Sequence, residues 1–254
     1  HNAAFAEAGF EIVYLPFEVK DVKEFVTRMV APQTREINWS LRGLSVTAPH
    51  KEEILELMNW IDPVAQRIKA VNTVVVEGDK LHGFNTDMEA AIRPLKKLAG
   101  ELSGLRVAVI GAGGAARALI CGLLQQHALI TIFNRSINRG QLLAEEFCVS
   151  TGTLDPANFD EFEVVVNTTP LGTKGHMEDQ SPATTEQLQR VRIVYDFVYN
   201  PIETRLIKNA REAGCQTLGG LEMLVEQAAA QFQLWTGQSA PLRVMDAAAR
   251  SALS

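Results

Sequence analysis

The stretch LRVAVIGAGGAARALICGLL, residues 105–124, constrains the fold more than any other part of the chain. A short apolar run, typical of a buried strand, leads into Gly111, Gly113 and Ala116, and a helical pattern follows. This is the GxGxxG/A pattern in the strand–turn–helix context that dinucleotide binding requires. Gly111 permits a tight turn and Gly113 lets the backbone approach a pyrophosphate, while the helix N-terminus offers free N–H groups to the anion.

The chain around this loop predicts a doubly wound parallel sheet and a particular cofactor. Five short, β-branched runs are almost continuously apolar, which is typical of strands covered on both faces. The second run is followed by Asn134 and Arg135, with Arg139 about one helical turn later, where an NAD enzyme usually carries Asp or Glu. Guanidinium groups pair with a 2′-phosphate, so NADP is favoured over NAD. The predicted strands are 105–110, 129–133, 162–167, 191–197 and 215–218.

The residues before this region predict a separate α/β domain. Strand and helix patterns alternate there, which favours a mainly parallel sheet covered by helices. Residues 72–87 read as a hairpin turning at Gly78 and Asp79, and Thr86 or Asp87 stands where the N-cap of a helix over 88–99 is expected. The predicted strands are 10–15 and 41–47, and the predicted helices are 21–30 and 50–58.

The C-terminal residues 220–237 and 242–253 predict two helices with no strand of their own, which we expect to pack back on the first domain. The overall prediction is therefore an α/β protein of two domains. Residues 1–99 and 221–254 form the first, and residues 100–220 form a Rossmann-type, doubly wound NADP-binding domain.

Charge and composition exclude several classes of function. The net charge is −6 and no block of Lys and Arg occurs, so the electrostatic footprint of a nucleic-acid binder is missing. No apolar run is long enough to cross a bilayer. The three cysteines lie far apart, without His at ligand spacing, which argues against a disulfide framework and a metal site and favours the cytoplasm.

One lysine raises a question about chemistry. In GLSVTAPHK, residues 43–51, Lys51 follows closely on a predicted strand. Taken alone, Lys51 reads as an exposed helix-start lysine and Asp87 as an N-cap. However, eight ordered blocks together resemble the shikimate dehydrogenase family across nearly the whole chain: GLSVTAPHK, AVNTV, GFNTD, GAGGAAR, NRS, NTTPLG, DFVYNPIET and GLEMLVEQAA.

The resemblance implies an NADP-dependent, reversible reduction of 3-dehydroshikimate to shikimate in the aromatic amino acid (chorismate) pathway. It implies that Lys51 and Asp87 are the catalytic pair and also contact the substrate. The other implied substrate contacts are Thr47, Asn72, Thr86, Tyr199 and Gln227. The implied cofactor contacts are Gly111, Gly113, Gly114, Ala115, Asn134, Arg135, Arg139, Thr168, Gly219 and Met223.

The residue types agree with this chemistry. Hydride delivery to a ketone leaves developing charge on oxygen, which a cation such as Lys51 can stabilise and protonate. The end of a strand in an α/β sheet is also where such folds place ligand groups. Two alternatives remain open: a quinate/shikimate dehydrogenase that uses NAD, and a non-catalytic sensor that keeps the fold to bind a ligand.

Two departures from the family pattern bear on the rest of the protein. Ser45 stands where many relatives have Asn. A Ser at this position resembles the family members that are fused to a dehydroquinate dehydratase. The family's first strand and its serine-bearing loop would lie before His1, so we expect the chain to be incomplete at its N-terminus. An upstream dehydroquinate dehydratase domain is therefore an expected fusion partner, alongside the small-molecule substrate.

Overall fold

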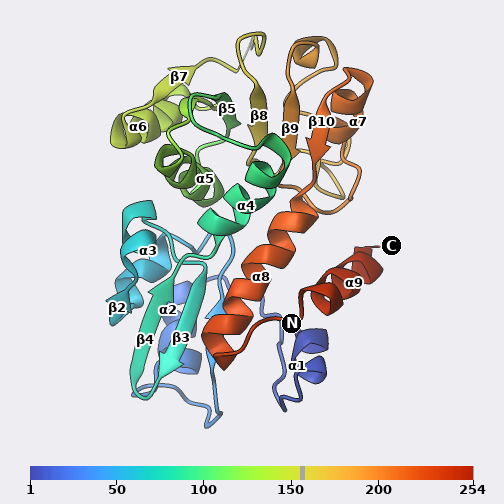
Figure 1. Ribbon diagram of the computed structural model, residues 1–254. Helices are drawn as coiled ribbons and strands as arrows, with labels where there is room; N and C mark the ends of the chain where they lie inside the picture. Colours follow the sequence, from blue (N-terminus) through green and yellow to red (C-terminus); the bar gives the residue numbers. More distant parts are fainter. Residues whose placement is uncertain (155–157, 254) are drawn as a thin grey trace. The chain divides into compact units, whose positions relative to one another are not determined.

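The computed structural model describes residues 1–154 and 158–253 (Figure 1). They divide into two compact units. Unit 1 comprises His1–Asp87 and Glu226–Ala248, and unit 2 comprises Met88–Val225 with the C-terminal residues from Ala249 onward. Each unit combines a sheet with helices, so the predicted α/β class is confirmed.

Unit 1 contains a four-stranded sheet. Its strands are β1 (Gly43–Ser45), β2 (Trp60–Ile61), β3 (Thr73–Glu77) and β4 (Lys80–Phe84), in the order β1-β3-β4-β2. β3 and β4 form the predicted hairpin, and Gly78 adopts the positive φ of 61° that suits its turn. β1 is antiparallel to β3, while β2 is parallel to β4. The prediction of a mainly parallel sheet is wrong, because the hairpin gives the central strands antiparallel partners.

The helices in the N-terminal part of unit 1, His1–Asp87, are short. They are α1 (Asn2–Glu7), α2 (Val22–Phe25), the π-helix η1 (Val26–Val30), the 3₁₀-helix η2 (Glu53–Leu57) and α3 (Pro63–Ile68). The predicted helix over 21–30 is confirmed as α2 running into η1, and Asp21 caps it by accepting from the backbone N of Glu24 at 2.9 Å. The predicted helix over 50–58 is instead the single 3₁₀ segment η2, preceded by a turn.

The predicted strand over 10–15 is wrong. A strand needs a neighbour for its backbone groups, and none of the strands in the described ranges pairs with these residues. Phe10, Ile12 and Tyr14 are partly buried, whereas Val13 and Leu15 are exposed, at 71% and 59%. The alternation expected of a strand is therefore present, but the described strands supply no hydrogen-bonding neighbour.

Unit 2 contains a six-stranded, wholly parallel sheet. Its strands are β5 (Arg106–Ile110), β6 (Leu129–Phe133), β7 (Ser150–Gly152), β8 (Val164–Asn167), β9 (Ile193–Asp196) and β10 (Gln216–Leu218). The five predicted strands are confirmed. The three-residue β7 was not predicted, because its residues form no apolar run. The order β10-β9-β8-β5-β6-β7 is the doubly wound order, in which the direction of winding reverses between β5 and β8.

Helices cover both faces of this sheet (Figure 1). Alternate residues of β5 enter different apolar clusters. Val107 and Val109 pack with residues of α4 (Asp87–Ala99) and α5 (Gly114–Gln125), and Ala108 and Ile110 pack with residues of α7 (Arg205–Glu212). This explains why the strands read as continuous apolar runs. The other helical segments between these strands are α6 (Ile137–Phe147) and η3 (Glu186–Leu188).

The two predicted C-terminal helices are present as α8 (Gly220–Thr236) and α9 (Leu242–Leu253). The later turns of α8 belong to unit 1, where the indole N of Trp235 donates to the carbonyl of Val74 at 3.0 Å. The compact units differ from the predicted boundaries at residues 99 and 220, because α4 from Met88 onward and the beginning of α8, up to Val225, group with unit 2. At α4 the reason is close packing: a Cβ on Gly122 of α5 would lie 2.4 Å from Ile92.

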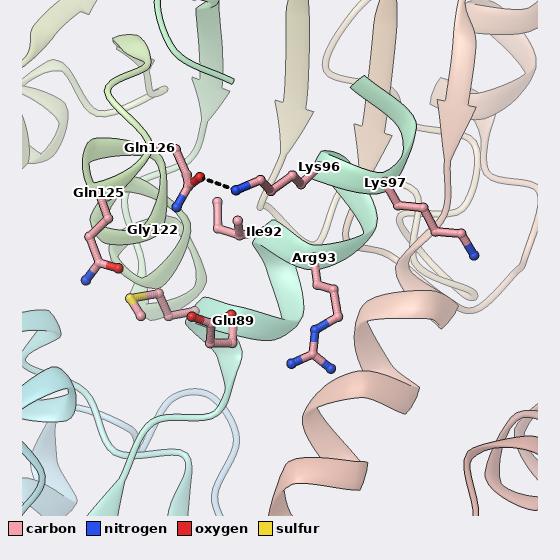
Figure 2. A pocket seen from close by; sticks show the side chains of 9 residues that line it. Glu89, Ile92, Arg93, Lys96, Lys97, Gly122, Gln125 and Gln126 are labelled. Carbon is pink, nitrogen blue, oxygen red and sulfur yellow. Dashed lines mark hydrogen bonds between the residues drawn. The ribbon is translucent and has the colours of Figure 1, made fainter. Parts of the chain in front are cut away.

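Unit 2 also has a surface hollow of about 460 Å³ between α4 and α5 (Figure 2). Lys96 donates to Gln126 at 2.8 Å across it, while Arg93 and Lys97, which also line the hollow, extend from α4 in other directions. The charged groups therefore diverge, and the hollow lacks the converging polar groups of a ligand site.

Candidate active site

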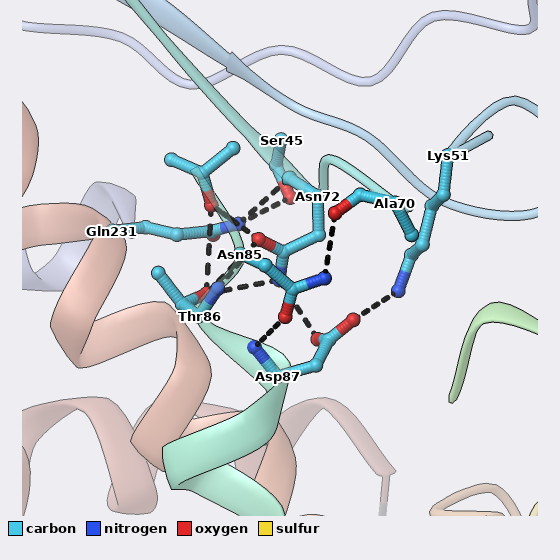
Figure 3. A network of polar contacts seen from close by, with 9 residues as sticks. Ser45, Lys51, Ala70, Asn72, Asn85, Thr86, Asp87 and Gln231 are labelled. Atoms are coloured by element: carbon cyan, nitrogen blue, oxygen red, sulfur yellow. Dashed lines mark hydrogen bonds and ion pairs between the residues drawn. The ribbon is translucent and has the colours of Figure 1, made fainter. Parts of the chain in front are cut away.

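The structure brings Lys51 and Asp87 together in unit 1 (Figure 3). Lys51 lies in the turn after β1, and Asp87 is the first residue of α4. The Lys51 Nζ lies 2.6 Å from Asp87 Oδ2, and the side chains are only 18% and 5% exposed. The turn is fixed in place because the Lys51 carbonyl accepts from the backbone N of Val71 at 2.8 Å. A partly buried cation thus stands beside a nearly buried carboxylate, with an edge open to solvent.

Asn72 fixes the other carboxylate oxygen. Its Nδ2 donates to Asp87 Oδ1 at 2.8 Å and to Thr86 Oγ1 at 2.9 Å. Its Oδ1 accepts from the backbone N of Thr86 at 2.8 Å and from Thr73 Oγ1 at 2.7 Å. Because a backbone N–H can only donate, the orientation of the Asn72 amide is determined. Asp87 is therefore held as an acceptor on both oxygens, by an amide and an ammonium.

The sequence prediction missed the outer part of this network. Gln231 on α8 is completely buried, and its Nε2 lies 3.0 Å from both Ser45 Oγ and Thr73 Oγ1. Asn85 donates to the carbonyl of Ala70 at 2.9 Å and accepts from the backbone N of Asp87 at 3.0 Å, which fixes the start of α4. Gln231 could have been found from its position one helical turn after Gln227, because residues four apart share a helix face.

The glycine loop of unit 2 has the geometry that its sequence predicts. Gly111 follows β5 with φ of 120°, and a Cβ there would lie 2.4 Å from Thr168 Oγ1. Gly113 is the N-cap of α5 and has an ordinary φ of −107°, yet nothing lies within 4 Å of where its Cβ would be. Neither backbone strain nor internal packing therefore demands glycine at 113. The open space above it fits the close approach of a phosphate to the helix N-terminus.

The adenosine end of the predicted cofactor site follows β6. Asn134 donates from Nδ2 to the carbonyl of Ser136 at 2.9 Å, which shapes the turn into α6. Arg135 and Arg139 are exposed, and neither forms an ion pair within the described ranges. Two cations without carboxylate partners next to a dinucleotide loop fit a 2′-phosphate.

Comparisons with known proteins agree with this geometry. Residues 1–74 match the shikimate dehydrogenase substrate binding domain, residues 94–194 match the shikimate/quinate 5-dehydrogenase profile, and residues 220–250 match the shikimate 5'-dehydrogenase C-terminal domain. The shikimate dehydrogenase (NADP(+)) of Methanococcus aeolicus is 34% identical, over 96% of this chain and 88% of that protein. The chain belongs to the shikimate dehydrogenase family.

Further relatives of the family are equally similar over nearly full length. The shikimate dehydrogenase (NADP(+)) of Moorella thermoacetica is 38% identical, over 100% of this chain and 88% of that protein. The crystal structure of shikimate 5-dehydrogenase from Thermus thermophilus, in complex with NADP(H) and shikimate, has a TM-score of 0.86 and 34% identity, covering 100% of this chain and 93% of that one. The resemblance seen in the sequence is thus confirmed.

The remaining site residues expected from the shikimate dehydrogenase family lie in varied settings. In unit 1, Thr47 is exposed just after β1, and Gln227 is partly buried on α8. In unit 2, Tyr199 is 44% exposed after β9, Gly219 follows β10, and Met223 is buried in the apolar cluster beside α4 and α5. The structure therefore joins Lys51, Asn72, Thr86 and Asp87 in one network of hydrogen bonds.

Proposed function

We propose that this protein is an NADP-dependent shikimate dehydrogenase that reversibly reduces 3-dehydroshikimate to shikimate in the aromatic amino acid pathway. The single observation that carries the proposal is the 2.6 Å pair of Lys51 and Asp87, held by Asn72. Membership of the family and relatives named shikimate dehydrogenase (NADP(+)) support it.

Lys51 and Asp87 would act as one catalytic unit. Bound NADPH supplies a hydride to the carbonyl carbon. The Lys51 ammonium stabilises the charge that develops on the carbonyl oxygen and gives that oxygen a proton, which leaves a neutral amine. The Asp87 carboxylate orients the ammonium and favours its recovery of a proton from solvent. In the reverse direction the same pair removes the hydroxyl proton.

Polar groups around the pair would select the substrate. Asn72 and Thr86 already lie in the network, so small changes in their bonds can admit a ring hydroxyl. A site that hydrogen-bonds a hydroxyl rejects an analogue that lacks it, because its buried polar groups are left unpaired. The proposed substrate contacts are Lys51, Asp87, Asn72, Thr86, Thr47, Tyr199 and Gln227.

The chain's own residues would hold NADP at the sheet of unit 2. The amides at the start of α5 meet the pyrophosphate, and the two arginines meet the 2′-phosphate. The proposed contacts are Gly111, Gly113, Gly114, Ala115, Asn134, Arg135, Arg139, Thr168, Gly219 and Met223. In domain terms, unit 1 would bind the substrate and unit 2 the cofactor.

Other properties stay predictions. No helix in the described ranges is both long and apolar enough to cross a membrane. We still expect a cytoplasmic location, no nucleic-acid partner and an upstream dehydroquinate dehydratase domain. The molecular mass of the protein in its native cells would test whether it is fused to that domain.

Steady-state kinetics separate the proposal from its alternatives. We expect kcat/KM to be highest with shikimate and NADP among the four combinations of shikimate or quinate with NADP or NAD. A preference for quinate with NAD would instead support the quinate/shikimate dehydrogenase. Binding of shikimate and NADP without any reduction of NADP would support a sensor.

A further inference from the structure

Asp196, at the end of β9, is a buried carboxylate that the proposed reaction does not use. It is completely buried and accepts three hydrogen bonds. Thr204 Oγ1 donates to its Oδ2 at 2.6 Å, while Asn167 Nδ2 and the backbone N of Val198 donate to its Oδ1 at 2.9 and 3.1 Å. Within the described part of the chain no cation pairs with it. Burying a charge without a counter-ion costs free energy, so the presence of a carboxylate here points to a function.

Asn167 connects this carboxylate to the turn after β8. Its Nδ2 donates to Asp196 and to the carbonyl of Leu171 at 3.2 Å. Its Oδ1 accepts from the backbone N of Thr169 at 3.0 Å and from Thr169 Oγ1 at 2.7 Å. All four hydrogen-bonding positions of the amide are therefore used, and they fix the turn over residues 167–171.

The same turn borders the glycine loop. Thr168 donates from its backbone N and from Oγ1 to the carbonyl of Ile110, at 2.9 and 2.8 Å. Ile110 immediately precedes Gly111, and a Cβ added at Gly111 would lie 2.4 Å from Thr168 Oγ1. The turn thus lies where the strand order reverses between β5 and β8, which is where doubly wound sheets bind ligands.

We propose that Asp196 is a positioning residue for the dinucleotide: through Asn167 it holds the turn 167–171 against the glycine loop in the conformation that binds NADP. This inference rests on the proposed cofactor of the chain. Burial raises the pKa of Asp196 to about 6, although its three donors oppose the rise. An oxygen acceptor for Asn167 is therefore kept at this position although burial disfavours its charge, which agrees with a role in holding the turn 167–171.

Three variants test the inference by fluorescence titration with NADPH, which measures affinity without turnover. Asp196→Ala removes the acceptor for Asn167, and we expect the Kd for NADPH to rise about tenfold, the loss typical of a hydrogen bond to a charged group. Asp196→Asn keeps an oxygen for Asn167 and Val198, so its Kd should stay within about threefold of wild type. Should Asp196→Ala fail to fold, Asn167→Ala breaks the same bond from the other side.

Asn209→Ala is the matched control. Asn209 is also a buried amide of unit 2, but its Nδ2 donates to the carbonyl of Ala183 at 2.8 Å, outside the turn 167–171. We expect it to lower the melting temperature and leave the Kd for NADPH unchanged. An unchanged Kd in folded Asp196→Ala or Asn167→Ala, or an equal rise in Asn209→Ala, would overturn the inference. Wild-type protein that binds NADPH but does not oxidise shikimate would refute the proposed activity alone.

Discussion

The buried carboxylate of Asp196 makes the stability of the protein depend on pH in a definite direction. Its pKa rises from 3.8 to about 6 on folding, with burial as the main cause. Between these values the folded state binds more protons than the unfolded state, so the free energy of unfolding falls as the pH rises. At about 1.4 kcal/mol per pKa unit, the change amounts to about 3 kcal/mol.

Asp196→Asn removes this titration while keeping the size of the side chain. We therefore expect the difference in unfolding free energy, wild type minus variant, to fall by about 3 kcal/mol between about pH 4 and pH 7, and to be constant above that. Other carboxylates titrate equally in both proteins and cancel in the difference. An ion-paired carboxylate has a lowered pKa in the folded state, and it would instead make the free energy of unfolding rise with pH.

Urea unfolding followed by far-ultraviolet circular dichroism is the appropriate assay. Trp39, Trp60 and Trp235 all lie in unit 1, so tryptophan fluorescence would miss unfolding of unit 2, where Asp196 lies. A difference that does not vary with pH, or one that rises with pH, would refute the account of Asp196 as a carboxylate whose charge is destabilised by burial.

Three further substitutions probe the sites. Gly113→Ala should change the melting temperature little, because the φ of Gly113 is ordinary and the added Cβ would meet no atom. It should nevertheless weaken NADPH binding at least tenfold in a titration, because the Cβ would occupy the space proposed for a phosphate. Unchanged binding would contradict a phosphate at that place. Gly43→Ala should lower the free energy of unfolding in urea by about 2 kcal/mol or more, because the added Cβ would overlap the carbonyl oxygen of Val74 and the Trp235 indole. A change near zero would contradict this packing. Replacing Arg139 by Ala should weaken binding of NADPH about tenfold but that of NADH less than twofold, and equal losses would argue against a 2′-phosphate contact.

Local chemistry explains what the sequence predicted well. The glycine loop, the five apolar strands of unit 2 and the hairpin at Gly78 each depend on neighbouring residues, so they can be read from a short stretch of chain. The proximity of Lys51 and Asp87 came from the family resemblance, since 35 residues separate them and no local pattern joins them.

Features that depend on distant partners were missed or mistaken. Residues 10–15 have the composition of a strand, but a strand exists only where a neighbour accepts its backbone bonds. The direction of the unit 1 sheet depended on which strands flank the hairpin, which composition does not reveal. Gln231 shares a helix face with Gln227, which the sequence prediction did not use. The role of Asp196 was missed because a single buried carboxylate has no periodic pattern, and only its hydrogen-bond partners show what it holds in place.

The kinetic effect of Lys51→Ala tests the central claim most directly, with absorbance of reduced nicotinamide followed after mixing enzyme, shikimate and NADP. Lys23→Ala is the control, because Lys23 forms an exposed pair with Glu56 at 3.2 Å elsewhere in unit 1. We expect Lys51→Ala to lower kcat about 1,000-fold, within the range for loss of a proton-transferring group, while NADPH affinity and the control stay near wild type. A Lys51→Ala enzyme within tenfold of the wild-type rate would contradict the assignment of that ammonium to the reacting oxygen.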